Sequence, residues 1–167
     1  THNYYTIFRY ILCIMKASVH TIPQKEFAHH SLLSRLLELH DIPKEIHIEG
    51  TLPDITIDEY GRATPRILTI VGSRKNTMYG KRVLESLIES IKGENIIIVS
   101  GLAYGIDSIA HKAALMHNIP TIAIPGSGLS RKVLYPRTHV SLAEELLEND
   151  GVLLSEFAED TSPAPWT

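Results

Sequence analysis

The stretch RILTIVGSRKNTMYGKRVLESLIESIKG, residues 66–93, joins an apolar run to an amphipathic segment through a polar, basic loop. The run RILTIVG has the length and the β-branched content of a buried strand. The segment YGKRVLESLIESIKG carries apolar residues at helical spacing and closes on Gly93. The stretch therefore predicts one strand–loop–helix unit, with Ser73, Arg74 and Lys75 at the point where the strand ends.

The same alternation continues along the chain. Short apolar runs (NIIIVSG, PTIAIPG and GVLLSEF) are separated by longer segments with helical spacing (GIDSIAHKAALMHN and HVSLAEELLEND). Strands that alternate with helices of this length are typical of parallel βαβ units. We therefore predict an α/β protein with a Rossmann-like, doubly wound, mostly parallel sheet.

The chain before this region has a different pattern. Apolar spacing predicts a helix at about residues 3–17 and a second one from about Pro23 to a point before Pro43, followed by the strand EIHIEG and the turn-rich loop TLPDITIDEYGRATP. We expect a small α-helical extension over residues 1–44 and a Rossmann-like domain over residues 45–167. Because the predicted strands make a thin sheet for this architecture, we also expect the domain to be incomplete at its C-terminus.

The amino-acid composition of the chain limits the kinds of partner that it can bind. The 167 residues include 16 Lys and Arg against 19 Asp and Glu, so any binding of nucleic acid requires a local basic patch. The single cysteine, Cys13, excludes an internal disulfide and a cysteine-rich zinc site. The run YYTIFRYILCIM is short and interrupted by Arg9, which argues against a membrane span and a signal peptide. These features predict a cytoplasmic protein with no membrane partner.

Glycine-containing loops follow the predicted strands. Ligands of open parallel sheets lie beyond the carboxyl ends of the strands, and glycine lets backbone N–H groups approach an anion closely. The position of these loops favours a phosphate-binding site at this edge of the sheet, with the planar guanidinium of Arg74 as a hydrogen-bond donor. The alternative is that the glycines only permit tight turns. The candidate residues in these loops are Gly72, Ser73, Arg74, Lys75, Ser100, Gly101, Gly126 and Gly128.

Known nucleotide and catalytic motifs do not fit these loops. Gly72 and Gly80 lie eight residues apart, and Lys81 is followed by Arg82, which excludes a P-loop. GSGLSR has Arg131 at the third glycine position of the dinucleotide fingerprint and follows the third strand. No serine occupies a G-x-S-x-G motif. We therefore expect no cofactor and no catalytic residue.

Two further groups have alternative interpretations. Asp107 and His111 share a helical face and could form a carboxylate–imidazole pair or ligate a metal. The interpretation we favour places Asp107 in the first helical turn, where its charge suits the helix dipole, and has His111 pack or face solvent, with no metal. Tyr104 could stack on a base or be an ordinary surface tyrosine.

A second basic group, Arg131, Lys132 and Arg137, follows the third strand in LSRKVLYPRTH. It should reach the same sheet edge as Arg74, and with Lys75 and other nearby cations it could form one positive stripe. An extended polyanion would use such a stripe more fully than a single nucleotide. The alternative is a solvated loop with scattered charges.

Several of these segments together resemble one family. VGSRKNTMYG, VSGLAYGIDSIAHKAAL, TIAIPGSGL, LYPRTH and GVLLSEF…SPAPW occur in this order in the DNA-processing protein A (DprA/Smf) family, and the similarity covers roughly residues 48–166. The resemblance implies an extended Rossmann-like domain that binds single-stranded DNA and helps load a RecA-type recombinase during natural transformation. It implies a protein that is not an enzyme and that forms a homodimer when full length.

The resemblance also implies roles for individual residues. Gly72, Ser73 and Arg74 would hold the DNA backbone, and Arg131 or Lys132 would supply the basic residue that follows the third glycine loop. The stretch between Leu129 and Tyr135 is about two residues longer than the family pattern, so the choice between these two cations stays open. The family pattern continues beyond Thr167 with a basic segment, a departure that suggests weak DNA binding by this chain.

Three functional hypotheses follow. The first is a single-stranded-DNA-binding protein that protects incoming DNA and acts without catalysis. The second is a nucleotide-binding or nucleotide-hydrolysing enzyme related to the lysine-decarboxylase-like group, although that group has PGGxGT where this chain has PGSGLS. The third is a recombinase-binding adaptor whose DNA contact is secondary.

Overall fold

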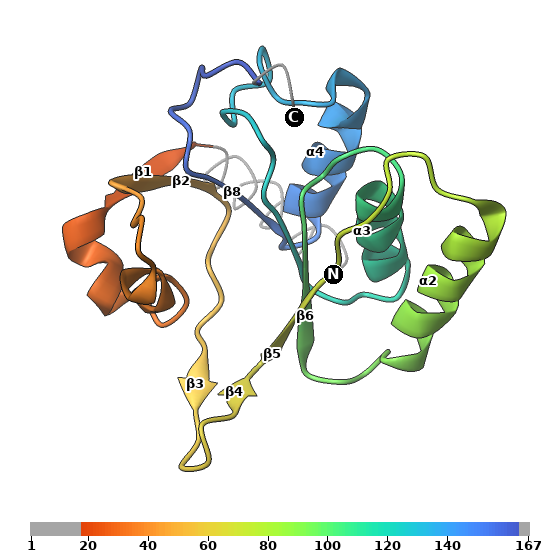
Figure 1. Cartoon of the computed structure of the whole chain (residues 1–167), viewed down its shortest axis with the longest axis horizontal. Coiled ribbons are helices and arrows are strands. Elements are labelled where there is room, and N and C mark those ends of the chain that lie inside the picture. The colour runs from red at the N-terminus through yellow and green to blue at the C-terminus, as the bar shows by residue number, and fades with distance from the viewer. Residues whose placement is uncertain (1–17, 164–167) are drawn as a thin grey trace, which may run out of the picture.

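The computed structural model describes residues 18–163. The predicted helix at residues 3–17, Cys13 and Trp166 lie outside this range. The described chain forms one six-stranded sheet in the order β1-β2-β8-β7-β6-β5, together with a separate two-stranded hairpin (Figure 1).

Four strands of the main sheet are parallel: β5 (Arg66–Thr69), β6 (Ile96–Ser100), β7 (Thr121–Ala123) and β8 (Val152–Ser155). β2 (Glu45–Glu49) pairs antiparallel with β8, and β1 (His20–Pro23) pairs antiparallel with β2. The predicted α/β class with a mostly parallel sheet is therefore confirmed.

Three α-helices connect the parallel strands, and each lies close to its predicted bounds: α2 (Met78–Ser90), α3 (Ile106–Met116) and α4 (Val140–Glu148). Because the strand order from β5 to β8 always advances in one direction, these helices cover the same face of the sheet (Figure 1). A doubly wound sheet has helices on both faces, whereas within residues 18–163 the other face is covered by short 3₁₀ segments.

Those 3₁₀ segments replace the second predicted helix. They are η1 (Gln24–His29) and η2 (Leu33–Glu38), and the backbone becomes extended at His30 between them. Each segment buries one large side chain, Phe27 or Leu33, against Ile48 and its neighbours on the sheet. β1 also lies within residues 1–44, so part of the predicted extension is hydrogen-bonded into the sheet.

β7 and β8 are buried at every position, as expected for strands of a sheet covered on both faces, and successive side chains point to opposite faces. Ile97, Ile122 and Val152 pack against the 3₁₀ segments. Ile98 faces α2 and α3, and Leu153 faces α4. This core fixes the register of β6, β7 and β8, and therefore fixes where their carboxyl ends lie.

Two local features differ from the sequence prediction. The loop that follows β2 contains the hairpin β3 (Thr56–Ile57) and β4 (Ala63–Thr64), which projects from the sheet in Figure 1. The strand at RILTIVG was predicted to be buried, yet β5 is an edge strand with exposed residues, because within the described residues it pairs only with β6.

Candidate nucleic-acid interface

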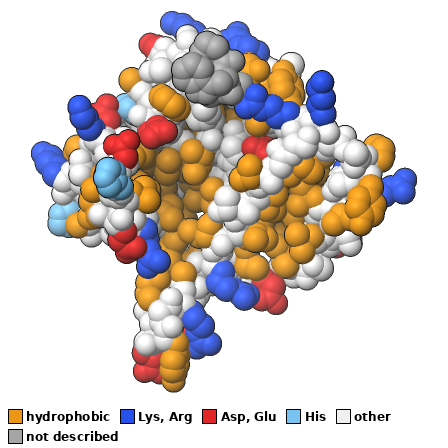
Figure 2. Space-filling model, in the orientation of Figure 1, with side chains coloured by type: hydrophobic (Ala, Val, Ile, Leu, Met, Phe, Trp, Pro, Cys, Tyr) orange, Lys and Arg blue, Asp and Glu red, His pale blue; other side chains and the backbone are white. Residues whose placement is uncertain are grey.

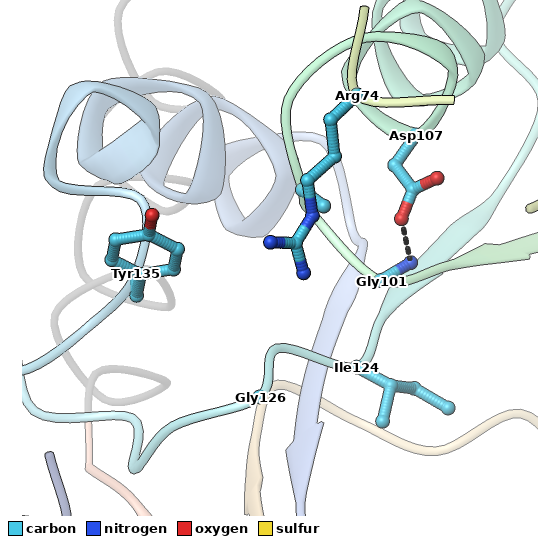
Figure 3. Close-up of a pocket in the computed structure, with 7 residues that line it drawn as sticks. Arg74, Gly101, Asp107, Ile124, Gly126 and Tyr135 are labelled. Atoms are coloured by element: carbon cyan, nitrogen blue, oxygen red, sulfur yellow. Dashed lines mark hydrogen bonds between the residues drawn. The ribbon is translucent and has the colours of Figure 1, made fainter. Parts of the chain in front are cut away.

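The carboxyl ends of β5, β6 and β7 meet around a pocket of about 310 Å³ (Figure 3). Each strand contributes a loop to it, as expected for a ligand site in an open parallel sheet. The lining residues are Arg74, Gly101, Ala103, Asp107, Ile124, Gly126 and Tyr135. Figure 2 shows Lys and Arg side chains along the upper rim of the molecule, where these loops lie.

Arg74 is held by the packing of its loop against the start of α3. The carbonyl of Ser73 accepts a hydrogen bond from the N–H of Ile106 at 3.1 Å, and the Ser73 hydroxyl accepts one from the N–H of Lys75 at 3.1 Å. Gly105 has φ +77°, and a Cβ there would collide with the backbone of Ser73 and Arg74. The two loops can therefore approach this closely only with glycine at position 105.

The Arg74 guanidinium has no hydrogen bond or ion pair with any residue in the range 18–163. Figure 3 shows it extending into the space between Tyr135 and Gly101. Lys75, next to it, is exposed. Because Arg74 is not neutralised by the described protein, it is available to an anionic or planar ligand.

Asp107 supports the loop that follows β6. Its Oδ2 accepts a hydrogen bond from the N–H of Gly101 at 3.1 Å, and a Cβ at Gly101 would lie 2.7 Å from this oxygen. Its Oδ1 is buried and has no hydrogen-bond partner among the described residues. The interpretation of Asp107 as a residue of the first helical turn is confirmed.

His111 packs inside the protein. It is fully buried, and its Nδ1 lies 2.8 Å from the Thr121 hydroxyl. Burial is the main cause that lowers its pKa to about 4; the Ser100 carbonyl opposes this shift, and the charge of His139 contributes to it. Among residues 18–163 no group of three metal-ligating side chains gathers at one place.

In the loop that follows β7, the two candidate cations Arg131 and Lys132 have different surroundings. Arg131 donates from Nη1 and Nη2 to the two carboxylate oxygens of Glu49, at 2.7 and 2.9 Å, and its Nε lies 3.6 Å from Glu144. Burial alone would lower the pKa of Arg131, but these carboxylates outweigh it and raise that pKa. Lys132 is exposed, and its ammonium group has no ion pair with the described residues.

Arg137 braces the same loop. Its Nη1 donates to the carbonyls of Arg131 and Lys132, at 2.8 and 2.6 Å, while the side chain stays exposed. The loop thus holds one cation, Arg131, in an internal ion pair and presents Lys132 and Arg137 to solvent.

Other predicted site residues lie outside the pocket lining. The Ser100 hydroxyl is buried and donates to the carbonyl of Ile70 at 2.7 Å. A Cβ at Gly72 would collide with Ile106, and one at Gly128 with the backbone of Glu159. These glycines therefore permit close packing within the protein, the alternative that the sequence had left open for the loops.

The sequence prediction missed two walls of the pocket, Tyr135 and Ile124. The Tyr135 ring meets Tyr104 edge-on at 6.4 Å between centroids, and Tyr104 also contacts the His139 ring at 5.1 Å. The sequence did contain a signal for Tyr135: it lies between Lys132 and Arg137, and many nucleic-acid sites combine aromatic and basic residues.

The fold and the site together define an α/β protein with a part-basic ligand pocket at the carboxyl edge of its sheet. The chain belongs to the family described as DNA recombination-mediator protein A, which matches residues 19–167. The family resemblance expected from the sequence is thereby confirmed.

Named relatives agree with this assignment. Protein Smf of Escherichia coli (strain K12) is 40% identical over 129 residues, which are 77% of this chain and 32% of that protein. DNA processing protein DprA of Bacillus subtilis (strain 168) is 34% identical over 131 residues, 78% of this chain and 41% of that protein. The chain thus spans less than half the length of these relatives.

Solved structures show the same fold. DNA processing protein A from Streptococcus pneumoniae matches with a TM-score of 0.69 and 27% identity, over 98% of this chain and 52% of that one. DNA processing protein A from Helicobacter pylori, whose structure is described for its single-stranded DNA binding mode, matches with a TM-score of 0.63 and 26% identity, over 90% of this chain and 60% of that one. No helix in residues 18–163 is long and apolar enough to cross a membrane.

Proposed function

We propose that this chain binds single-stranded DNA at the carboxyl edge of its sheet, as part of a protein that processes DNA during natural transformation and acts without catalysis. The observation that carries the proposal is the guanidinium of Arg74, which extends into a pocket between three strand ends with no described partner. Family membership and the Helicobacter pylori relative support it.

The phosphate contacts are assigned to exposed cations of the two basic loops. Arg74 and Lys75 follow β5, and Lys132 follows β7. Of the two cations left open by the sequence, we assign the DNA contact to Lys132, because the charge of Arg131 is already balanced by Glu49 and Glu144. Arg137 is a further cation on this rim.

The proposal extends to the whole protein. We infer that the longer protein is a cytoplasmic homodimer that protects incoming DNA and helps to load a RecA-type recombinase. This inference rests on membership of the recombination-mediator family. We also propose that the chain divides into an extension at residues 1–44 and a domain at residues 45–167.

Replacing Arg74 is the direct test of the site. Arg74→Ala is expected to weaken binding of a single-stranded oligonucleotide and to reduce the slope of log affinity against log salt by about 0.7, the value for one phosphate contact on a single strand. Lys132→Ala should give a similar loss. Gel-shift titration at several salt concentrations measures both quantities.

Arg35→Ala is the matched control, because Arg35 is exposed in η2, between β1 and β2 at the far side of the sheet from β5. It should leave affinity and salt slope unchanged. An Arg74→Ala chain with the affinity and slope of the unmodified chain would remove Arg74 from the site.

One observation favours an enzyme as second candidate. Asp107, a buried acid, lines the same pocket as Arg74, and a nucleotide hydrolase of the lysine-decarboxylase-like group needs an acid near the sugar. Against it, Asp107 uses Oδ2 to hold Gly101. Release of the free base from nucleoside monophosphates would support the enzyme.

A further inference from the structure

The first turn of α2 presents an exposed aromatic side chain outside the pocket. Tyr79 is 78% exposed, the highest value among the large apolar and aromatic side chains of residues 18–163. Its ring meets no other aromatic ring, and its hydroxyl has no hydrogen bond, within that range. The helix packs on the sheet through Leu84 and Ile88 instead. The Tyr79 ring is therefore available to stack on a ligand.

A cation lies next to this ring on the same face of the helix. Arg82 follows Tyr79 by three residues, a spacing that makes two side chains neighbours on a helix surface. Arg82 is exposed, and its guanidinium has no ion pair or hydrogen bond with the part of the chain that the structure describes. Glu85, an acid within one turn of Arg82, lies 3.6 Å from the ammonium group of Lys81 instead. The first turn of α2 thus carries an aromatic ring beside a positive charge that is not neutralised.

This surface continues from the basic loop that follows β5. Arg74 and Lys75 precede α2 by a few residues, and the helix begins at the carboxyl edge of the sheet, where that loop lies (Figure 1). The loop is fixed to the helix by Thr77, whose hydroxyl oxygen accepts a hydrogen bond from the N–H of Gly80 at 3.1 Å. The fold therefore holds the cations of the loop and the first turn of α2 in one arrangement.

The combination of side chains suits a single strand of nucleic acid. Surfaces that bind single strands combine aromatic rings, on which bases stack, with cations that contact the backbone. Val83 and Leu87 extend the exposed apolar face of α2, and alone they would suit a protein partner. At the first turn, however, Lys75 precedes and Arg82 follows Tyr79, and a polyanion is the ligand that uses both charges.

We propose that the bound strand passes from the basic loops onto the first turn of α2, where one base stacks on Tyr79 and one phosphate lies against Arg82. The inference rests on the proposed binding of single-stranded DNA and specifies the path of the strand beyond the loops. The strand then follows the carboxyl edge of the sheet from Lys132, past Arg74, to α2.

Strands with and without bases separate the two contacts. The 167-residue chain is titrated with oligothymidylate and with an abasic strand that has the same number of phosphates. Tyr79→Ala should weaken binding of oligothymidylate about tenfold and leave binding of the abasic strand unchanged. Tyr79→Phe keeps the ring and should bind as the unmodified chain does. Arg82→Ala should weaken binding of both strands and reduce the slope of log affinity against log salt by about 0.7.

Tyr60→Ala is the matched control for the aromatic ring. Tyr60 is 73% exposed, but it lies in the hairpin that precedes the amino end of β5, so its loss should leave binding of both strands unchanged. Unchanged binding of oligothymidylate by Tyr79→Ala would overturn the path over α2, leave that face to a protein partner and let the proposed function stand. An equal loss for both strands in Tyr79→Ala, or an unchanged salt slope in Arg82→Ala, would also overturn the path. Binding of neither strand by the unmodified chain would overturn the proposed function as well.

Discussion

Arg131→Ala is expected to lower the free energy of unfolding by about 3 kcal/mol, because it leaves a buried carboxylate without its partner. Glu49 is almost fully buried in β2, and both of its oxygens accept hydrogen bonds from Arg131, at 2.7 and 2.9 Å. Urea denaturation at neutral pH measures the loss. A value for Arg131→Ala within about 0.5 kcal/mol of the unmodified chain would show that the pair does not stabilise the fold.

A surface ion pair supplies the control. Arg66 and Glu94 also form a short pair, at 3.0 Å, but both side chains are mostly exposed. Arg66→Ala should therefore cost less than about 1 kcal/mol. The contrast between the two variants depends on the burial of the carboxylate, since each substitution removes the same guanidinium.

Acidification is expected to destabilise the chain through His111. Its pKa is about 4 in the folded protein and near 6.5 in the unfolded chain, so between these values the unfolded state binds the additional proton. The contribution of His111 is complete above about pH 6.5 and is lost as the pH falls to about 4, a change of about 3 kcal/mol.

His111→Asn isolates this contribution, because asparagine does not titrate but keeps a polar atom near the Nδ1 position that contacts Thr121. Urea unfolding of both chains at several pH values between about 7 and about 4 gives the comparison. The variant should start less stable and lose about 3 kcal/mol less over the range. Parallel pH profiles would show that His111 does not titrate in this window.

The sequence predicted the elements that depend on local pattern. The helices α2, α3 and α4 follow from apolar spacing and the parallel strands from short apolar runs. β1 was missed because His20–Pro23 buries only Ile22, and its strand character comes from pairing with β2, more than twenty residues later. The sequence predicts one helix in place of the two 3₁₀ segments because the apolar pattern that includes Phe27 and Leu33 continues across the break at His30.

The site was predictable to the level of loops. Because the strands are parallel, the loops after β5, β6 and β7 were expected to meet at one edge, and the structure places Arg74 in the pocket there. The ion pair of Arg131 with Glu49 was not predictable, because the two residues lie 82 positions apart in the sequence. The hydrogen bond from Gly101 to Asp107 likewise depends on the tertiary position of α3. The sequence alone therefore predicted an open phosphate site at this glycine loop.

Binding of DNA by the chain itself tests the central claim most directly. Fluorescence anisotropy of a labelled oligonucleotide, single-stranded and then annealed to its complement, is measured with the 167-residue chain at a low and a near-physiological salt concentration. We expect the single strand to bind more tightly than the duplex, because a flexible strand can bring its phosphates to both basic loops, and we expect its affinity to fall as salt rises. No binding of the single strand at low salt, or equal binding of strand and duplex, would contradict the account.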